Sequence, residues 1–305
     1  MRRAVIDIGT NSTRLFLADV EDGVVGDVLE RRTVITRLGA GVDADGRLAD
    51  DAMERVYVVL DEYRALIDGH GGAQAVAVMT SAVRDAANGA SFALAVGERW
   101  GFEPHVLTGD EEAELTFLGA TSERDPDDRT PTLVLDIGGG STEFVIGTGR
   151  EMTFHVSNQA GVVRQSERHL HSDPPDPVEL DALASDVRSI LASGVPERFR
   201  RSVAWAIGVA GTATSMASIA QGLEPYDPDK VEGYVVDIDE CRRILDRLAR
   251  LSLEERRQVR GLHPDRAPTI VAGVIILLET LALFGLSSFE VSEHDILRGA
   301  ALGLF

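Results

Sequence analysis

The chain alternates between short apolar runs that end in glycine-rich turns and longer stretches whose apolar residues recur at helical spacing. Its most informative run begins at Thr132, passes Asp136 and three glycines, and resumes as the apolar segment Phe144–Ile146. An apolar run, a glycine-rich turn and a second apolar run predict two strands joined in a hairpin. This hairpin carries one carboxylate at the end of its first strand and another, Glu143, at the start of its second.

A second copy of this pattern opens the chain. The segment Val5–Arg14 reads VIDIGTNSTR, and the segment Val134–Glu143, which begins 129 residues later, reads VLDIGGGSTE. A repeat at so long a spacing predicts two duplicated domains, because solenoid repeats recur about every 20–50 residues. The copies differ in the turn and at the last position, where an arginine corresponds to a glutamate.

The rest of the pattern predicts strands and helices in alternation, which indicates α/β domains with ligands at the loops beyond the strand ends. The polar stretch Ser122–Thr130 is the clearest linker, so we expect one domain of residues 1–122 plus about 293–305 and a second of residues 123–292. Beyond the two hairpins, the expected strands are 24–36, 76–79, 105–107, 151–156, 203–208 and 288–292. The expected helices are 50–68, 88–100, 108–121, 177–193, 239–249, 266–284 and 295–304, with one more that starts at Gly161–Arg164 and one that follows Val209–Thr214.

Composition narrows the class of protein. The 305 residues are 44% hydrophobic and 26% charged, as in globular proteins, and the apolar run Ile270–Leu278 is too short to span a membrane. A net charge of −20 argues against nucleic acid as a partner, because duplex binding relies on basic surface. Lys230 is the only lysine, which excludes a P-loop. The single cysteine, Cys241, excludes an internal disulfide, so we expect a cytoplasmic protein.

The second hairpin has the residues of a phosphate-and-metal loop. Glycines at Gly138–Gly140 allow the backbone to approach a bound group, and successive N–H groups through Ser141 form an anion-binding concavity. Asp136 and Glu143 cannot bind phosphate, but their carboxylates can hold Mg²⁺ over it. Single acids are common in turns. Two acids beside three glycines, in a segment that the chain repeats, favour a functional role over a structural one.

Other residues of these turns have two interpretations. Asn11 and Arg14 either contact a phosphate or close the first hairpin, and Asp7 occupies the position that Asp136 occupies in the second. The later turn at 208–212 either holds a nucleotide or the far end of a substrate, or only reverses the chain.

These motifs resemble those of a known family. The pair DIGTNSTR and DIGGGSTE, with the turn VAGTAT after a later strand, is similar to the loops of the actin-like/sugar-kinase ATPase superfamily. The more specific segments, in chain order, are Thr80–Arg84, Gly109–Ala113, Gly161–Arg164 and Arg266–Ala267. Together they resemble the exopolyphosphatase / guanosine pentaphosphate phosphohydrolase family in its short, two-domain form. The chain departs from the family at Leu297–Ala300, where Leu-Arg-Glu-Gly is usual.

The resemblance implies an α/β fold of two duplicated ribonuclease H-like (actin-like) domains with a cleft between them. It implies that Glu112 activates water, that the neighbouring Glu111 caps a helix, and that Arg84 binds phosphate. The acids that it implies for Mg²⁺, largely through water, are Asp7, Asp136 and Glu143, of which the last two are also expected to be catalytic. The expected substrate-binding residues are Gly9, Asn11, Ser12, Arg14, Arg84, Gly138, Gly139, Gly140, Ser141, Gly208, Gly211 and Thr212.

The expected function is Mg²⁺-dependent hydrolysis of the terminal phosphate of inorganic polyphosphate. The 5′-phosphate of guanosine pentaphosphate is an alternative substrate for the same residues, and analogy with relatives suggests a homodimer. A kinase on the shared fold would transfer phosphate to an acceptor, and a polyphosphate or nucleotide sensor would bind without turnover. The Glu-Glu-Ala motif and the lack of an acceptor-site signature argue against the kinase, and Glu112 together with both acidic loops argues against the sensor.

Overall fold

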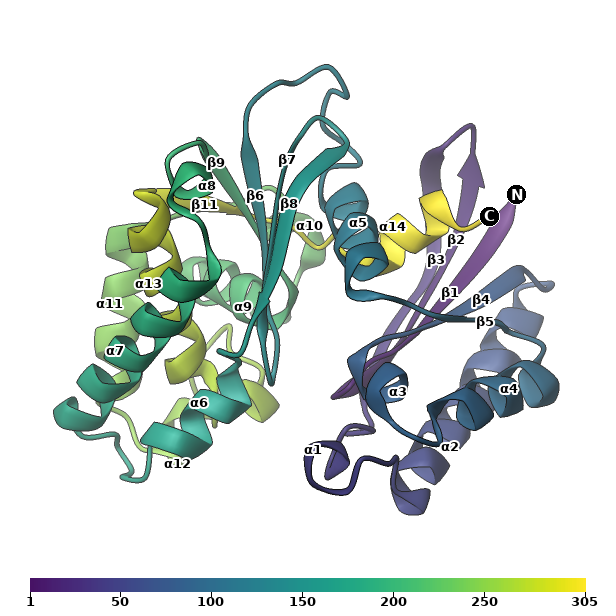
Figure 1. The fold of residues 1–305 in the computed structure, drawn as a ribbon, viewed down its shortest axis with the longest axis horizontal. Helices are drawn as coiled ribbons and strands as arrows, with labels where there is room; N and C mark the ends of the chain where they lie inside the picture. The colour runs from purple at the N-terminus through teal and green to yellow at the C-terminus, as the bar shows by residue number, and fades with distance from the viewer. The chain divides into compact units, whose positions relative to one another are not determined.

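The computed structural model describes residues 1–305, apart from the side chains of residues 43 and 44, and the chain forms two compact units (Figure 1). Unit 1 comprises Met1–Gly119 together with Ile296–Phe305, so the end of the chain returns to the unit in which it starts. Unit 2 comprises Ala120–Asp295. Each unit has one mixed sheet with flanking helices.

The sheet of unit 1 has five strands in the order β3-β2-β1-β4-β5. Strand β1 pairs antiparallel with β2 and parallel with β4, while β3 pairs antiparallel with β2 and β5 pairs parallel with β4. Because β1 is the central strand, it is buried from Ala4 to Ile8. The strands are β1 (Arg2–Ile8), β2 (Ser12–Glu21), β3 (Val24–Ile35), β4 (Gln74–Met79) and β5 (Glu103–Val106).

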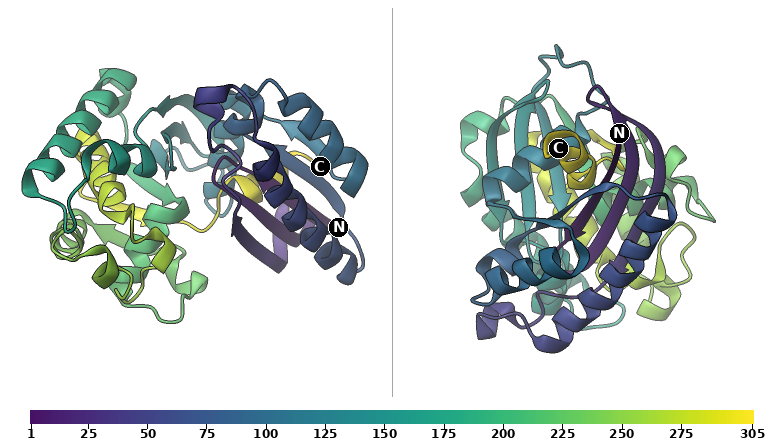
Figure 2. Two further views of the ribbon diagram at one scale, coloured as in Figure 1. Left: turned by 90° about the horizontal axis from the view of Figure 1, so that it is seen from below. Right: turned by 90° about the vertical axis from the view of Figure 1, so that its right-hand side faces the viewer.

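Helices cover both faces of this sheet. One core contains Ile6 and the residues Val56, Leu60 and Ile67, which α2 presents at helical spacing. Its neighbour Val5 belongs to a second core on the opposite face, together with apolar residues of α14. Figures 1 and 2 show α14 on that face of the sheet. The helices are α1 (Val42–Asp45), α2 (Asp50–Gly69), α3 (Ser81–Asp85), α4 (Gly89–Trp100), α5 (Gly109–Ala120) and α14 (Ile296–Gly303).

The sheet of unit 2 has six strands in the order β10-β11-β9-β6-β7-β8. When β10 is set aside, β8, β7, β6, β9 and β11 repeat the order and the directions of β3, β2, β1, β4 and β5. The predicted duplication of α/β domains is therefore confirmed. The strands are β6 (Thr132–Ile137), β7 (Thr142–Thr148), β8 (Glu151–Asn158), β9 (Trp205–Val209), β10 (Val235–Asp237) and β11 (Ser288–Val291).

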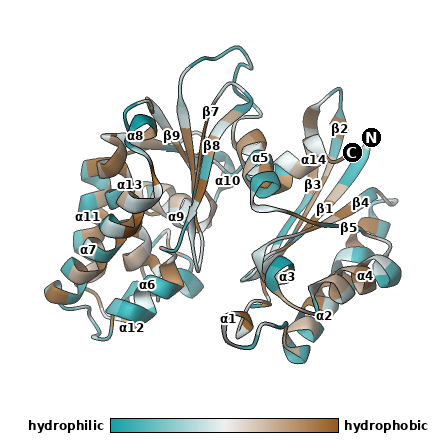
Figure 3. Ribbon diagram, in the orientation of Figure 1, coloured by the Kyte–Doolittle hydropathy of each residue, from teal (hydrophilic) through white to brown (hydrophobic). Residues whose placement is uncertain are grey.

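The core of unit 2 is built around α13, which is apolar along most of its 15 residues (Figure 3). Helix α7 packs against it and begins at a capping box of Asp176 and Glu179 with Pro177 at the first turn. No helix in the described part of the chain has the length and apolarity that crossing a bilayer requires. The helices are α6 (Val162–His169), α7 (Pro177–Gly194), α8 (Glu197–Arg200), α9 (Ala210–Gln221), α10 (Pro228–Val231), α11 (Ile238–Ala249), α12 (Leu253–Arg256), the 3₁₀ helix η1 (Pro264–Arg266) and α13 (Ile270–Phe284).

The elements that the sequence did not predict are short. Strand β10 has three residues and exists because β11 supplies its backbone partners. Helices α3, α8, α10 and α12 have four or five residues, too few for a helical period to be visible. The helix expected at 266–284 begins instead at Ile270, after η1, and the strand expected at 203–208 begins at Trp205.

Candidate active site

The two predicted hairpins have the same backbone turn. In unit 1, the N–H of Gly9 donates to the carbonyl oxygen of Ser12 at 2.9 Å, and in unit 2 the N–H of Gly138 donates to that of Ser141 at 2.9 Å. A Cβ added to either glycine would lie 3.2 Å from that same carbonyl oxygen. Both turns are thus tight, and glycine relieves the same close approach in each.

In unit 1, the turn directs its carbonyl oxygens toward the segment that follows β3. The Asn11 oxygen accepts from the N–H groups of Thr36 (3.1 Å) and Arg37 (2.9 Å), and the Thr10 oxygen accepts from Gly39 (2.8 Å). The N–H groups of Thr10 and Asn11 donate to no other group among the described residues. Because the carbonyls are used and the N–H groups are not, the turn offers donors to an anion.

In unit 2, the turn meets the start of α6 in the same way. The Gly138 oxygen accepts from the N–H of Val162, and the Gly139 oxygen accepts from that of Val163, both at 2.9 Å. The first N–H groups of α6 are satisfied by these carbonyls. Within the described chain, the N–H groups of Gly139 and Gly140 donate to nothing else, so this turn also offers donors to an anion.

Arg164 lies beside the glycine turn, although the sequence did not single it out as a site residue. Its Nε donates to the carbonyl oxygen of Gly140 at 2.9 Å. Gly161 allows the start of α6 to approach the turn this closely, because a Cβ on it would lie 2.3 Å from the Gly139 oxygen and from the Gly140 carbonyl carbon. The only sequence signal was the family segment Gly161–Arg164, which does not reveal what the guanidinium contacts.

The acids of the two hairpins have different partners. Asp7 and Arg14 lie directly opposite each other in the β1–β2 ladder, and Asp136 and Glu143 lie opposite each other in the β6–β7 ladder. In unit 1, Arg14 Nε and Nη2 lie 2.7 and 2.6 Å from Asp7 Oδ2. The first hairpin therefore contains an ion pair, and the second contains two carboxylates on one face of the sheet.

Hydroxyl groups orient Glu143. Its Oε1 accepts from the hydroxyl of Ser141 in the turn and from that of Ser157 in β8, the latter at 2.9 Å. Ser157 belongs to a strand beyond the hairpin, and it reaches the glutamate because the two residues are paired in the β7–β8 register. The sequence contained no signal for that contact.

The donor set of the second hairpin fits Mg²⁺. This ion prefers oxygen ligands, retains several waters, and is usually bound through one or two carboxylates together with substrate phosphates. Asp136 and Glu143 supply two carboxylates on neighbouring strands beside the glycine turn. The described residues contain no cluster of three or more Asp, Glu, His or Cys that could enclose a metal ion by itself.

Glu112 is in the first turn of α5, close to Arg84 from α3. Arg84 Nη1 lies 3.3 Å from Glu112 Oε2 and donates to the carbonyl oxygen of Leu107 at 2.8 Å. The arginine is thus anchored on the backbone at the end of β5, beside the expected base. Both side chains are about 30% exposed, at 31% and 28%, so water can reach them.

Glu111 has the expected role as a cap. Its Oε2 accepts from the N–H and the hydroxyl of Thr108 at 2.8 and 2.9 Å, and its own N–H donates to the Thr108 hydroxyl at 3.2 Å. These reciprocal bonds form a capping box. The backbone bond from Thr108, followed by the bond from its hydroxyl, lowers the pKa of Glu111. Of the two adjacent glutamates, Glu111 therefore caps the helix, and Glu112 lies next to Arg84.

Two further contacts hold these elements in unit 1. The hydroxyls of Thr10 and Ser81 lie 2.9 Å apart, which ties the first turn to the helix that carries Arg84. In α14, a Cβ on Gly299 would lie 1.8 Å from the carbonyl oxygen of Leu115 in α5. Glycine at this position, within the segment that departs from the family pattern, allows α14 to pack directly on the helix of Glu112.

The third expected turn follows β9. A Cβ on Gly208 would lie 2.9 Å from the Cβ of Ala213 and from the Phe289 ring, so packing alone accounts for this glycine. Ala210, the first residue of α9, has φ of 60°, in the left-handed region that favours glycine. The hydroxyl of the buried Thr212 faces α13. The ligand role of this turn stays a prediction.

Arg266 holds the same turn. Its Nη1 donates to the carbonyl oxygen of Gly211 and lies 3.1 and 3.2 Å from the hydroxyls of Thr214 and Ser215. Burial lowers the pKa of Arg266, and the nearby Glu293 opposes that shift. The guanidinium is thus a structural clamp of the α9 N-terminus.

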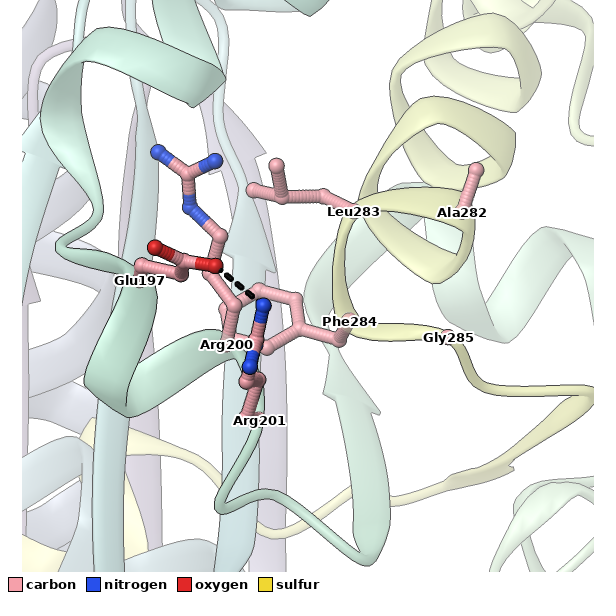
Figure 4. A pocket seen from close by; sticks show the side chains of 7 residues that line it. All are labelled: Glu197, Arg200, Arg201, Ala282, Leu283, Phe284 and Gly285. Atoms are coloured by element: carbon pink, nitrogen blue, oxygen red, sulfur yellow. Dashed lines mark hydrogen bonds and ion pairs between the residues drawn. The ribbon is translucent and has the colours of Figure 1, made fainter.

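A surface hollow in unit 2 is unrelated to these residues (Figure 4). Within it, the Arg201 guanidinium pairs with Glu197 at 2.5 Å, and Arg200 donates to the carbonyl oxygens of Ala192 and Val195. The hollow lies where the chain enters β9 and β11, whereas the glycine turn follows the other end of the parallel strand β6. It contains none of the expected site residues.

Comparison with known proteins identifies the family. A model of the Ppx/GppA phosphatase family matches residues 16–302. Exopolyphosphatase 2 of Mycobacterium tuberculosis is 38% identical over 318 residues, which cover 99% of this chain and 98% of that protein. The bifunctional 3-dehydroquinate synthase/phosphatase of Fusobacterium nucleatum is 32% identical over 98% of this chain and 46% of its own length.

Solved structures agree with the sequence relatives. A Ppx/GppA family member from Aquifex aeolicus has a TM-score of 0.87 and 32% identity, covering 100% of this chain and 97% of that one. An exopolyphosphatase-like protein has a TM-score of 0.86 and 35% identity, covering 99% and 97%. These likenesses extend over both units. The chain therefore belongs to the Ppx/GppA phosphatase family, and it is a phosphoanhydride hydrolase.

Proposed function

We propose that the protein is an exopolyphosphatase that removes the terminal phosphate of inorganic polyphosphate. The observation that carries this proposal is the contact of Arg84 with Glu112, because it puts a phosphate-binding cation beside a carboxylate that can activate water. Full-length similarity to Exopolyphosphatase 2 supports polyphosphate as the substrate.

In the proposed reaction, Glu112 accepts a proton from the attacking water. The water oxygen forms a bond to the terminal phosphorus, the bond from that phosphorus to the bridging oxygen breaks, and the shortened chain leaves with the electron pair. Arg84 and the N–H groups of the unit 1 turn donate to the phosphoryl oxygens, where negative charge develops. Asp136 and Glu143 would hold Mg²⁺, which offsets the charge of the phosphates when bound.

The test is phosphate release by the purified full chain with Mg²⁺ from polyphosphates of defined length, guanosine pentaphosphate and ATP in parallel. Glu112→Gln preserves shape but cannot accept the proton, so we expect kcat to fall by about 10²–10³-fold with a small change in KM. Glu111→Gln is the matched control, since it changes the adjacent carboxylate, and its activity should stay near that of the parent.

Each competing function has its own outcome. Preference for guanosine pentaphosphate would retain the mechanism and change the substrate. Transfer of the ATP phosphate to an acceptor would indicate a kinase, and polyphosphate binding without release would indicate a sensor. Equal loss of activity in Glu111→Gln and Glu112→Gln would refute the assignment of Glu112 as the base.

A further inference from the structure

An arginine that the proposed reaction does not use lies beside the first turn. Arg37 follows β3, and its backbone N–H donates to the carbonyl oxygen of Asn11 at 2.9 Å, next to the equivalent bond from Thr36. Two residues later, the N–H of Gly39 donates to the carbonyl oxygen of Thr10 at 2.8 Å. The segment that carries Arg37 is therefore bound to the turn whose N–H groups are open to an anion.

The backbone of Arg37 has an unfavourable conformation. Its φ is 51°, in the left-handed region that glycine adopts readily and that costs free energy in a residue with a Cβ. Such conformations persist where the surrounding structure enforces them, and they concentrate at functional sites. A glycine would make the same backbone hydrogen bonds with less strain, so the fold does not need a side chain at this position. The guanidinium is thus a better candidate for a role in binding than in folding.

The guanidinium of Arg37 is accessible. The residue is exposed, and among the described residues its side chain has no hydrogen bond, ion pair or ring contact. The nearby Arg55 differs, because it pairs with Asp51 and donates to the carbonyl oxygen of Thr36. A planar fork of donors at a fixed backbone position suits phosphate oxygens. Because the chain has a net charge of −20, a polyanionic ligand depends on such local cations.

Arg37 and Arg84 lie on opposite sides of the turn. The turn joins β1 to β2 in the strand order β3-β2-β1-β4-β5, so Arg37 follows the strand at one side, and Arg84 belongs to α3, which follows the strand at the other. Three strand spacings separate β3 from β4, which is about 14 Å. A single phosphoryl group occupies one place beside the turn, whereas a row of linked phosphates can extend from the Arg84 side to the Arg37 side.

We propose that Arg37 binds a phosphate of polyphosphate beyond the terminal one and thereby sets the affinity for long substrates. This inference rests on the proposed function in taking polyphosphate as the ligand of the first turn. Arg84 and the N–H groups of that turn hold the phosphoryl group that is attacked, and Arg37 holds the substrate behind it. Because Arg37 does not touch the bond that breaks, it acts on binding and leaves the chemical step unchanged.

The test compares variants of the full chain on polyphosphates of defined length. Arg37→Gln should raise KM about tenfold for substrates of about ten or more phosphates, keep kcat within about twofold, and leave KM for tripolyphosphate unchanged. Arg37→Lys retains the charge without the fork of donors, so it should recover part of the loss. Arg250→Gln removes an exposed arginine that follows α11 in unit 2, and as the control it should leave both constants unchanged.

The variant Arg37→Gly separates the guanidinium from the backbone conformation. It removes the side chain and relieves the left-handed strain, so we expect the same rise in KM as in Arg37→Gln, together with an equal or higher Tm. A lower Tm with unchanged KM would show that Arg37 serves the fold, and it would overturn the inference. An equal rise in KM for tripolyphosphate would also overturn it, because Arg37 would then bind the terminal phosphate.

Binding without turnover distinguishes this inference from the proposed function. Long polyphosphate is titrated calorimetrically into Glu112→Gln and into the double variant with Arg37→Gln, which we expect to bind about tenfold more weakly. Equal affinities, or a fall in kcat as large as the fall in kcat/KM, would overturn the inference. A parent that binds polyphosphate through Arg37 but releases no phosphate would refute the proposed function and retain the inference.

Discussion

The β1–β2 hairpin of unit 1 and the β6–β7 hairpin of unit 2 have the same register and are closed by the same hydrogen bond, yet they differ in how their turns are held. Backbone N–H groups donate to the carbonyl oxygens of both turns, but the other contacts of the two hairpins differ. In unit 1, the Thr10 hydroxyl contacts Ser81, and Arg14 pairs with Asp7. In unit 2, Arg164 Nε donates to the Gly140 oxygen, and Gly161 packs against two turn glycines. The same duplicated backbone thus places an arginine opposite the aspartate in unit 1 and a glutamate opposite it in unit 2.

The largest expected effect comes from removing the equivalent aspartates. Asp136→Asn takes one of two carboxylates from the second hairpin, so we expect phosphate release to fall by about 10²–10³-fold with little change in stability. Asp7→Asn instead leaves a poorly solvated guanidinium without its carboxylate, so we expect a loss of about 3 kcal/mol in the free energy of unfolding. Urea unfolding and steady-state kinetics on both variants measure the two quantities. Equal effects on both quantities would mean that the hairpins have one role.

The next largest effect concerns the glycine that packs closely against each turn. A Cβ on Gly161 would lie 2.3 Å from backbone atoms of unit 2, so Gly161→Ala should cost about 3 kcal/mol. A Cβ on Gly39 would lie 2.3 Å from the Thr10 side-chain methyl, and Gly39→Ala should cost about 1 kcal/mol. The double variant with Thr10→Ser, which lacks that methyl, should recover most of the smaller loss in thermal unfolding. No recovery would show that the Thr10 methyl is not the group that the added Cβ displaces.

The smallest expected effect concerns the first turns of α5 and α6, which are capped in different ways. The α5 start has its own capping box, whereas the first N–H groups of α6 donate to the glycine turn. Glu111→Gln retains a neutral capping partner but removes the negative charge at the helix N-terminus, so it should lower the free energy of unfolding by about 0.5 kcal/mol at neutral pH. Because bonding to Thr108 lowers the pKa of Glu111, its contribution is present above its ordinary value and is lost as the pH falls through the lowered one. Unfolding of parent and variant at pH 7, 5 and 4 should show the difference shrinking only toward the lowest pH, and a constant difference would exclude the ionised cap.

Much of the fold could be predicted from the sequence because it depends on residues that are close together in the chain. The two hairpins are visible in ten-residue segments, since a strand, a tight turn and a returning strand need only neighbouring residues. The helix expected at 88–100 was observed at Gly89–Trp100 for the same reason. Elements such as β10 were not readable, because their existence depends on a partner strand far along the chain.

The sequence predicted which residues belong to the candidate site, but not which of their side chains contact one another. The sequence by itself determined the repeat, the glycine turns, the acids at 136 and 143 and the Glu-Glu pair, because these are short-range patterns. Only the tertiary structure decided that Arg14 pairs with Asp7, that Ser157 reaches Glu143, and that Glu112 lies beside Arg84. Side-chain partners are chosen by strand register and helix packing, which bring together residues that no local pattern relates.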